Sequence, residues 1–299
     1  MSGGERNERK RKQQQQQRQG QRQSGKGGQQ SRSSRGAKAV ASARGVKTGR
    51  NRVVVAVVVV VVLAVAIIGG VLYSTSQHKE QDSIADQIRT ELKIGDNGVS
   101  ATKVPQEKLA PRIAGDGVVE AGNPSAVLTA DLYEDFICPY CGQLYKQSNT
   151  ELEKAIDDGK IKLRYHLLGF LDGNSSPPGY SSRAASAALC SVDDGRFRPY
   201  YEQLFSKQPE EDGPGYSDQQ LTKTGQDVGL GADFAKCVSS GKYRGAVRDG
   251  TQQGEQRLQQ LSGGKSVGTP TVVVNNHIVR ALGEANWLSN LIGAKGGKD

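Results

Sequence analysis

The stretch YEDFICPYC, residues 133–141, decides the fold of this chain. It follows the short apolar run AVLTADL (126–132), which is typical of a buried strand. Residues 143–156 then carry apolar side chains at helical spacing and end at an Asp-Asp-Gly helix stop. The two cysteines therefore stand where a strand gives way to a helix. Pro139 takes the first helical position, which needs no N–H donor.

The segments that follow complete a mixed pattern of strands and helices. Residues 161–168 alternate between apolar and polar side chains, which predicts a second strand. Residues 181–260 are helical in pattern, and residues 271–282 predict two strands joined by a tight turn before a final helix. Because a helix follows a strand early and a hairpin comes late, the sequence predicts an α/β fold with a mixed sheet.

The positive charge of the chain is concentrated at its N-terminus. Lys and Arg number 40 and Asp and Glu 31 in 299 residues, but residues 1–52 hold 15 basic and only 2 acidic residues. The remainder is net acidic, which argues against a nucleic-acid-binding domain. Residues 1–52 contain no aromatic residue, so we expect a disordered cytosolic tail. Binding of RNA or anionic lipid by this tail stays an alternative.

Residues 53–73 are predicted to form a transmembrane anchor. They carry no charge, and a helix of this length spans roughly 30 Å, the thickness of the bilayer hydrocarbon. Ala64-Val65-Ala66 also matches a signal-peptide cleavage site, but the long leading segment favours an uncleaved anchor. The basic residues before the span place the N-terminus in the cytosol. We therefore expect a single-pass protein of the cell membrane with an extracytoplasmic C-terminal domain.

Residues 74–111 are mostly polar and predict a stalk between the anchor and a domain at residues 112–299. Ile84, Ile88 and Leu92 lie four residues apart, which indicates one amphipathic helix within this stalk. Such a stripe of apolar side chains could pack on a partner or on another copy of the chain.

The spacing of Cys138 and Cys141 points to redox chemistry. Cys138 would lie at the helix N-terminus, where free N–H groups and the helix dipole stabilise a thiolate. Cys141 lies one turn further on, where it can attack a mixed disulfide formed at Cys138. Tyr140, between them, is expected to be exposed and to contact a substrate or partner. The pair therefore supplies a nucleophile and a resolving thiol.

Two other interpretations of this pair are weaker. A disulfide that only staples the chain would close too short a loop to constrain the unfolded state much. A zinc site needs four ligands, yet Cys190 and Cys237 are single and distant, and the histidines show no ligand spacing. No metal ion or other cofactor is therefore predicted.

Five stretches together resemble the DsbA-like branch of the thioredoxin superfamily, in its membrane-anchored actinobacterial form. They are YEDFICPYC (133–141), RAASAALC (183–190), GRFRPYYEQLF (195–205), FAKCVSSGKY (234–243) and SVGTPTVVVNNHIV (266–279). The resemblance covers residues from about 117 to 293. It implies a thioredoxin fold with a helical insertion at about 181–258.

The resemblance also implies roles for residues outside the cysteine pair. Thr269 and Pro270 match the family's cis-proline loop, which faces the two cysteines and binds the substrate chain together with Pro139 and Tyr140.

Glu134 and Asp135 directly precede the CxxC motif. A buried carboxylate at this place could relay protons to Cys141. The alternative is a pair of strand-end charges in water.

Cys190 and Cys237 both fall in the implied insertion. In an oxidising compartment we expect them to form a structural disulfide. A shuttle pair that exchanges with Cys138 and Cys141, or two free buried thiols, are the alternatives.

The function implied by the resemblance is thiol–disulfide exchange, in the direction of disulfide formation in secreted or cell-envelope proteins. Its partner would be a quinone-linked membrane reoxidase of the DsbB or vitamin-K-epoxide-reductase (VKOR) type. Thr269 and the Pro139-Tyr140 dipeptide also occur in reducing and isomerising relatives, so a reductase or isomerase fed by a membrane electron carrier is the alternative. A second alternative is a non-catalytic binding or holdase module on the same scaffold.

Overall fold

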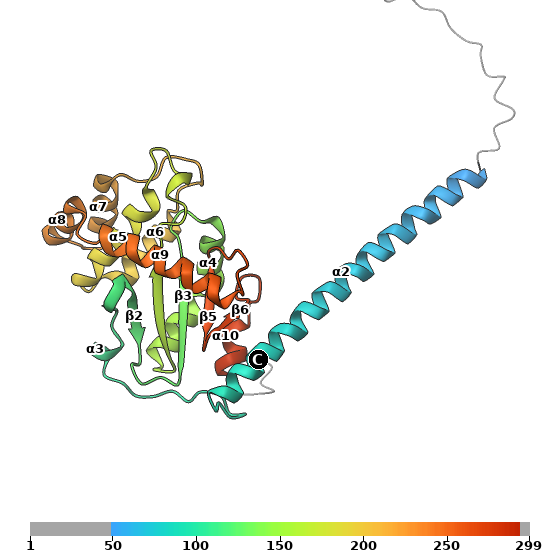
Figure 1. Ribbon diagram of the computed structural model, residues 1–299, viewed down its shortest axis with the longest axis horizontal. Coiled ribbons are helices and arrows are strands. Elements are labelled where there is room, and N and C mark those ends of the chain that lie inside the picture. The colour runs from blue at the N-terminus through green and yellow to red at the C-terminus, as the bar shows by residue number, and fades with distance from the viewer. Residues whose placement is uncertain (1–48, 294–299) are drawn as a thin grey trace, which may run out of the picture. The chain divides into compact units, whose positions relative to one another are not determined.

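The computed structural model describes residues 49–293, and it gives side chains for residues 62–293 except 64, 65 and 116 (Figure 1). Its contacts divide the chain into two units, Met1–Ala64 and Val65–Asp299. Helix α2 (Gly49–Glu91) contains the end of the first unit and the beginning of the second.

The predicted tail and much of the predicted anchor lie outside the residues and side chains that the structure describes. Residues 1–48 of the tail lie outside the described residues, as do the side chains of 53–61, 64 and 65 in the predicted span. Among the residues that were described, no helix is both long enough and apolar enough to cross a membrane. The anchor therefore stays a prediction.

The second unit is built on a mixed sheet, as the sequence predicts. The described strands form one six-stranded sheet in the order β1-β2-β4-β3-β5-β6. They are β1 (Arg112–Ile113), β2 (Val119–Gly122), β3 (Leu128–Glu134), β4 (Ile161–Leu167), β5 (Thr271–Val274) and β6 (His277–Val279). Strands β3 and β4 run parallel, with Leu128 opposite Ile161, and every other pair is antiparallel.

Helices surround the sheet and fill the connection between β4 and β5. The short α3 (Gln106–Leu109) and the 3₁₀ turn η1 (Gly115–Gly117) precede β2, α4 (Pro139–Asp157) follows β3, and α10 (Trp287–Ile292) ends the domain. Between β4 and β5 lie η2 (Asp172–Asn174), α5 (Tyr180–Asp193), α6 (Phe197–Ser206), α7 (Asp218–Asp227), α8 (Ala232–Ser240) and α9 (Arg244–Leu261). The predicted helical insertion at about 181–258 is thus present.

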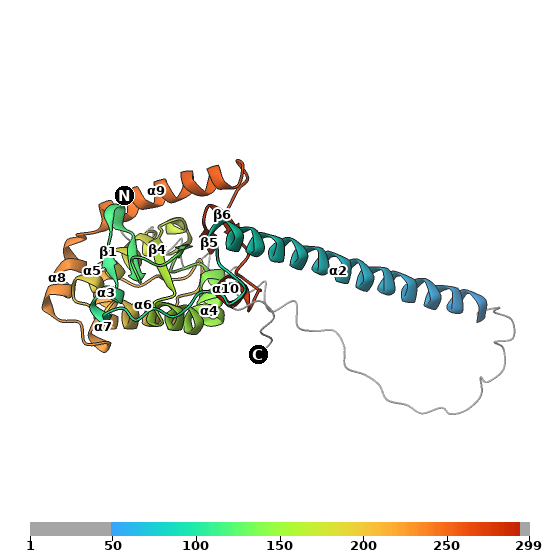
Figure 2. The same cartoon turned by 90° about the horizontal axis from the view of Figure 1, so that it is seen from below.

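Side chains of β3 divide the core into two layers because they alternate between the faces of the sheet. Leu128, Ala130 and Leu132 belong to the main core, which also contains apolar residues of α4 and α10. Tyr133 points to the other face and joins a smaller cluster beneath α9. Figure 2 shows α9 and α4 on opposite sides of the sheet.

The prediction that residues 74–111 form a stalk outside the domain is wrong in part, because some of these residues belong to the domain's core. Ala85 and Ile88 of α2 are buried in the main core, and Ile84 and Leu92 pack against it. The apolar stripe therefore covers the domain's own core and needs no partner to shield it. Periodicity revealed the amphipathic helix, but it could not reveal which surface the helix covers.

Arg89 fixes this part of α2 to the C-terminal end of α10. Its buried guanidinium donates to the carbonyl oxygens of Leu291 (3.0 Å), Gly293 (2.8 Å) and Gly95 (2.7 Å). The last carbonyl groups of a helix lack partners within it, so a cation there stabilises the helix end.

Candidate active site

The two cysteines of the CxxC motif lie where β3 passes into α4. Cys138 is the residue that caps α4, and Pro139 is its first helical residue. Both cysteines are free thiols, and Cys138 is 4% exposed while Cys141 is fully buried. The N–H of Cys141 donates to the Cys138 carbonyl at 3.1 Å, which begins the helix. An incoming sulfur can therefore reach Cys138 more readily than Cys141.

The loop before β5 closes over Cys138. The Cys138 thiol lies 3.2 Å from the carbonyl oxygen of Thr269 and donates to it. The Thr269–Pro270 peptide bond is cis. The structure thus brings together Thr269, Pro270 and the cysteine pair, which lie about 130 positions apart in the sequence.

The surroundings of the two thiols move their pKa values in opposite directions. The pKa of Cys138 is lowered to about 6, because hydrogen bonds to its sulfur from the Cys141 thiol, the Thr269 side chain and the backbone N–H groups of Cys141 and Tyr140 outweigh desolvation. The pKa of Cys141 is raised well above its ordinary value, chiefly by burial and by its hydrogen bond to Cys138. A reactive thiolate thus stands beside a resolving thiol that keeps its proton.

Glu134 is a buried carboxyl group next to this pair. It is 1% exposed, and the Tyr201 hydroxyl donates to its Oε2. Its Oε1 has no hydrogen-bond partner among the described residues. Burial raises its pKa to about 8, and its charge in turn raises the pKa of Cys141. The interpretation of Glu134 as a strand-end charge in water is wrong.

Asp135 is also buried, but its hydrogen bonds are satisfied. Its carboxylate accepts from the Ile137 N–H (3.0 Å), the Leu171 N–H (2.9 Å) and the Ser181 hydroxyl (2.6 Å). Burial raises its pKa to about 6. These contacts join the CxxC turn to the loop after β4 and to α5, so Asp135 positions the site, and it too is no solvated charge.

Two residues of the insertion contact the site without any spacing signal. Tyr201 and Gln208 lie 67 and 70 residues from their partners Glu134 and Cys138. The Gln208 amide donates to the carbonyl oxygens of Phe136 (3.1 Å) and Cys138 (2.8 Å). The only sequence signal for Tyr201 was its place in the stretch GRFRPYYEQLF (195–205), which carries part of the family resemblance. Gln208 lies outside that stretch.

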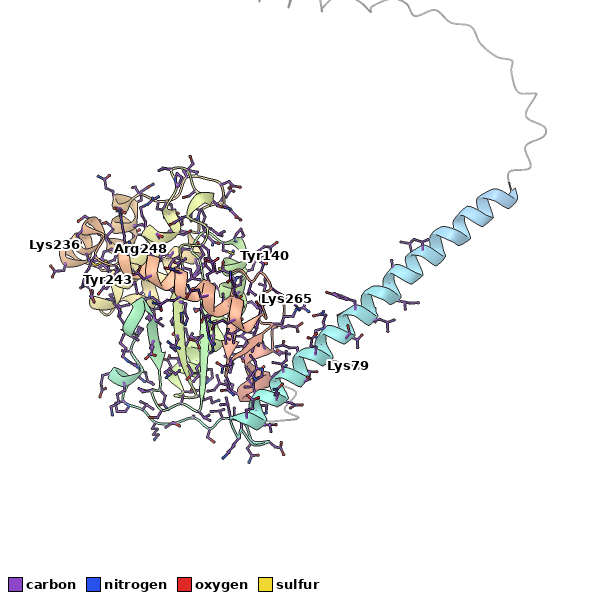
Figure 3. All side chains as sticks on the ribbon, in the orientation of Figure 1. Lys79, Tyr140, Lys236, Tyr243, Arg248 and Lys265 are labelled. Atoms are coloured by element: carbon purple, nitrogen blue, oxygen red, sulfur yellow. A yellow bond between two sulfur atoms is a disulfide. The ribbon has the colours of Figure 1, made fainter. Side chains whose placement is uncertain are left out.

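The remaining predicted residues lie in two places. Tyr140 is 58% exposed at the surface beside Cys138, where its side chain is free to meet another molecule (Figure 3). Cys190 and Cys237 form a disulfide between α5 and α8, with an S–S distance of 2.05 Å. The alternative of two free thiols is therefore wrong. Over residues 49–293, no cluster of three or more His, Cys, Asp or Glu side chains could hold a metal ion.

The fold and the dithiol define the class: this is a protein of the thioredoxin superfamily. A family model described as thioredoxin matches residues 114–294, and the chain belongs to that family.

Among curated proteins, the chain is 31% identical over 188 residues to the serine/threonine-protein kinase PknE of Mycobacterium tuberculosis. This match covers 61% of the chain and 32% of the kinase, so the chain spans about a third of that relative's length.

Two solved structures share the fold. The MdbA thiol-disulfide oxidoreductase from Corynebacterium diphtheriae superposes with a TM-score of 0.53 at 22% identity, covering 62% of this chain and 93% of that one. The MdbA protein from Corynebacterium matruchotii gives a TM-score of 0.51 at 22% identity, covering 72% of this chain and 99% of that one.

Proposed function

We propose that this protein catalyses thiol–disulfide exchange, that the exchange runs in the oxidising direction, and that it introduces disulfides into secreted or cell-envelope proteins. The observation that carries this proposal is the lowered pKa of Cys138 beside the raised pKa of Cys141. A stabilised thiolate favours the reduced form of the site. The oxidised form is then a stronger acceptor of electrons from substrate thiols.

The first step begins from the Cys138–Cys141 disulfide. A substrate thiolate attacks the Cys138 sulfur, which forms a mixed disulfide and breaks the Cys138–Cys141 bond. Cys141 leaves as a thiolate in a buried environment that disfavours its charge, so it takes up a proton. Glu134, with a pKa of about 8, carries a proton at neutral pH and is the group that supplies it.

The second step releases the oxidised substrate. A second substrate thiolate attacks the substrate sulfur of the mixed disulfide, and Cys138 leaves as a thiolate. Its low pKa makes it a good leaving group. The substrate has then lost two electrons and two protons, and Cys138 and Cys141 hold the two electrons. We expect the backbone of Thr269, whose carbonyl oxygen lies 3.2 Å from the Cys138 sulfur, to pair with the extended substrate chain.

Renewed turnover needs an oxidant for the reduced pair. We propose a quinone-linked membrane protein of the DsbB or VKOR type, reached because residues 53–73 anchor the chain and place the domain outside the cytosol. The basic segment before that run supports this orientation. The Cys190–Cys237 disulfide supports an oxidising compartment.

The test is the equilibrium reduction potential of Cys138 and Cys141 in the full-length protein against glutathione buffers. Alkylation and mass spectrometry would report the state of each cysteine. We expect a potential towards the roughly −120 mV of DsbA and well above the roughly −270 mV of thioredoxin. A value near or below thioredoxin's would mean a reductase. A pair that never reduces would leave only the binding-module interpretation.

A further inference from the structure

A cavity of about 350 Å³ lies between α9 and the sheet, on the side of the sheet opposite α4 (Figure 2). Residues 250, 253, 254 and 257 of α9 line it, and because they are three and four positions apart they share one face of the helix. Two of them, Gly250 and Gly254, put no side chain into the space. The volume is within the range of ligand pockets, about 300–1,000 Å³. We call this space the α9 cavity.

The sheet under the cavity is charged, although a sheet face that a helix covers is usually apolar. Glu120 of β2, Arg164 of β4 and Asp131 of β3 lie directly opposite one another in the strand register. Arg164 pairs with Asp131 at 2.8 Å and with Glu120 at 3.3 Å. His166 lies 2.7 Å from Asp131, and Arg112 lies 2.8 Å from Glu120. Each carboxylate therefore already has two partners, and the described lining of the cavity offers no unpaired carboxylate to a cation.

Two donors at the cavity lack an acceptor that matches them. The Arg257 guanidinium donates to the Asn276 side chain and has no carboxylate partner among the described residues. Tyr133 is 3% exposed, and its hydroxyl makes no hydrogen bond to any described residue. The Tyr133 ring stacks on the His166 ring, with 4.1 Å between their centroids. Burial, and secondly the charge of Asp131, raise the pKa of Tyr133 to about 12, so the hydroxyl keeps its proton at neutral pH and can donate it to an acceptor.

We propose that the α9 cavity binds the oxyanion group, a carboxylate or a phosphate, of a small molecule. Arg257 supplies a positive charge that no described carboxylate neutralises, and the buried Tyr133 hydroxyl supplies a second donor. Both groups would gain the acceptor that they lack, which removes the cost of an unsatisfied buried donor.

A small molecule is the occupant that fits, because α9 covers the space on one side and the sheet closes it on the other. The cavity lies across the sheet from α4, the helix that begins at the reactive cysteines. The inference therefore concerns a second site and does not depend on the direction of thiol–disulfide exchange.

The first experiment measures the affinity of the full-length protein for inorganic phosphate and for succinate. Isothermal titration calorimetry at pH 7 gives each Kd, with sodium chloride holding the ionic strength constant. Arg257→Gln removes the charge and keeps an amide, and it is expected to weaken the tighter probe about tenfold or more, the effect of losing a charge-assisted hydrogen bond. Tyr133→Phe removes only the hydroxyl, and it is expected to weaken binding about fivefold.

Arg248→Gln is the matched control. Arg248 is an exposed arginine of the same helix, it lies outside the cavity, and it pairs with its neighbour Asp249 (Figure 3). Its substitution is expected to leave the affinity for both probes unchanged.

The outcomes separate the possible ligands. Tighter binding of phosphate would assign a phosphate group and tighter binding of succinate a carboxylate, and either result supports the site. No saturable binding of either probe to the parent protein would overturn the inference. Affinities equal to the parent's in both Arg257→Gln and Tyr133→Phe would also overturn it, as would an equal loss in Arg248→Gln, which would indicate a general effect of surface charge.

A second measurement locates the bound anion directly. Phenylglyoxal modifies accessible guanidinium groups, and mass spectrometry reports the rate at each arginine. A saturating concentration of the tighter probe is expected to slow the modification of Arg257 and to leave the rate at Arg248 unchanged. Equal rates at Arg257 with and without the probe would overturn the assignment of the site.

Discussion

Replacing Glu134 by glutamine should change the free energy of unfolding increasingly in favour of the variant as the pH rises, and it should slow the first exchange step. The carboxyl group is buried, and one of its oxygens has no partner among the described residues. Burial raises its pKa from 4.5 to about 8. Because the pKa of Glu134 is higher in the folded protein than in the unfolded chain, the free energy of unfolding is greatest when Glu134 is protonated in both states. The free energy of unfolding then falls as the pH rises from about 4.5 to about 8. Glutamine stays neutral throughout.

The size of the effect follows from this shift. At pH 7 the ionisable Glu134 lowers the free energy of unfolding by about 3 kcal/mol relative to a neutral group of the same shape, and at pH 5 by less than about 1 kcal/mol. In the variant, the glutamine amide group would lie where Oε1 of Glu134 has no hydrogen-bond partner. This unsatisfied polar group lowers the free energy of unfolding of the variant by about 1–3 kcal/mol at every pH. The stability difference between variant and parent should therefore grow by about 2–3 kcal/mol from pH 5 to pH 7.

The assay is urea unfolding at pH 5, 6, 7 and 8 in a Cys138→Ala, Cys141→Ala background, which removes the titrating thiols and leaves the Cys190–Cys237 disulfide intact. Glu202→Gln, at an exposed position of α6, controls for the loss of one negative charge. A stability difference that does not change with pH would refute the reasoning, because it would mean that Glu134 is ionised in the folded protein. With the cysteines restored, Glu134→Gln should slow mixed-disulfide formation about 100-fold, since it cannot protonate Cys141.

Three further predictions concern other parts of the site. Alkylation of Cys138 by iodoacetamide should rise with a midpoint near pH 6, as its pKa of about 6 requires, while Cys141 stays unmodified; a midpoint above pH 8 would contradict the assignment. Gln208→Ala should lower the free energy of unfolding by about 1–2 kcal/mol, because the carbonyl oxygens of Phe136 and Cys138 lose its amide as a donor, whereas Gln226→Ala, at an exposed position, should not; equal stability of the two variants would contradict this role of Gln208. Removing the Cys190–Cys237 disulfide by serine substitutions should lower stability by about 4 kcal/mol for its 47-residue separation and leave exchange intact, and loss of exchange in the folded double variant would indicate a shuttle pair.

The parts of the fold that the sequence predicted are those with a local signal. The alternating residues 161–168 and the hairpin at 271–282 correspond to β4, β5 and β6. Strands β1 and β2 were not predicted, because each is too short to show a pattern and forms only by pairing with a neighbour. A two-residue strand such as Arg112–Ile113 has no periodicity to detect.

Residue spacing alone determined that Cys138 begins a helix and that Cys141 lies one turn later, because helix geometry and the helix dipole act within a few residues. Family resemblance to known sequences placed Thr269 beside them. Only the tertiary structure decided that Glu134 is buried against Tyr201, that Gln208 contacts the Cys138 carbonyl, and that Arg89 of α2 contacts the Leu291 carbonyl. These contacts join residues 67 or more positions apart. The desolvation that shifts the Glu134 pKa comes from the surrounding core, so no local stretch of sequence encodes it.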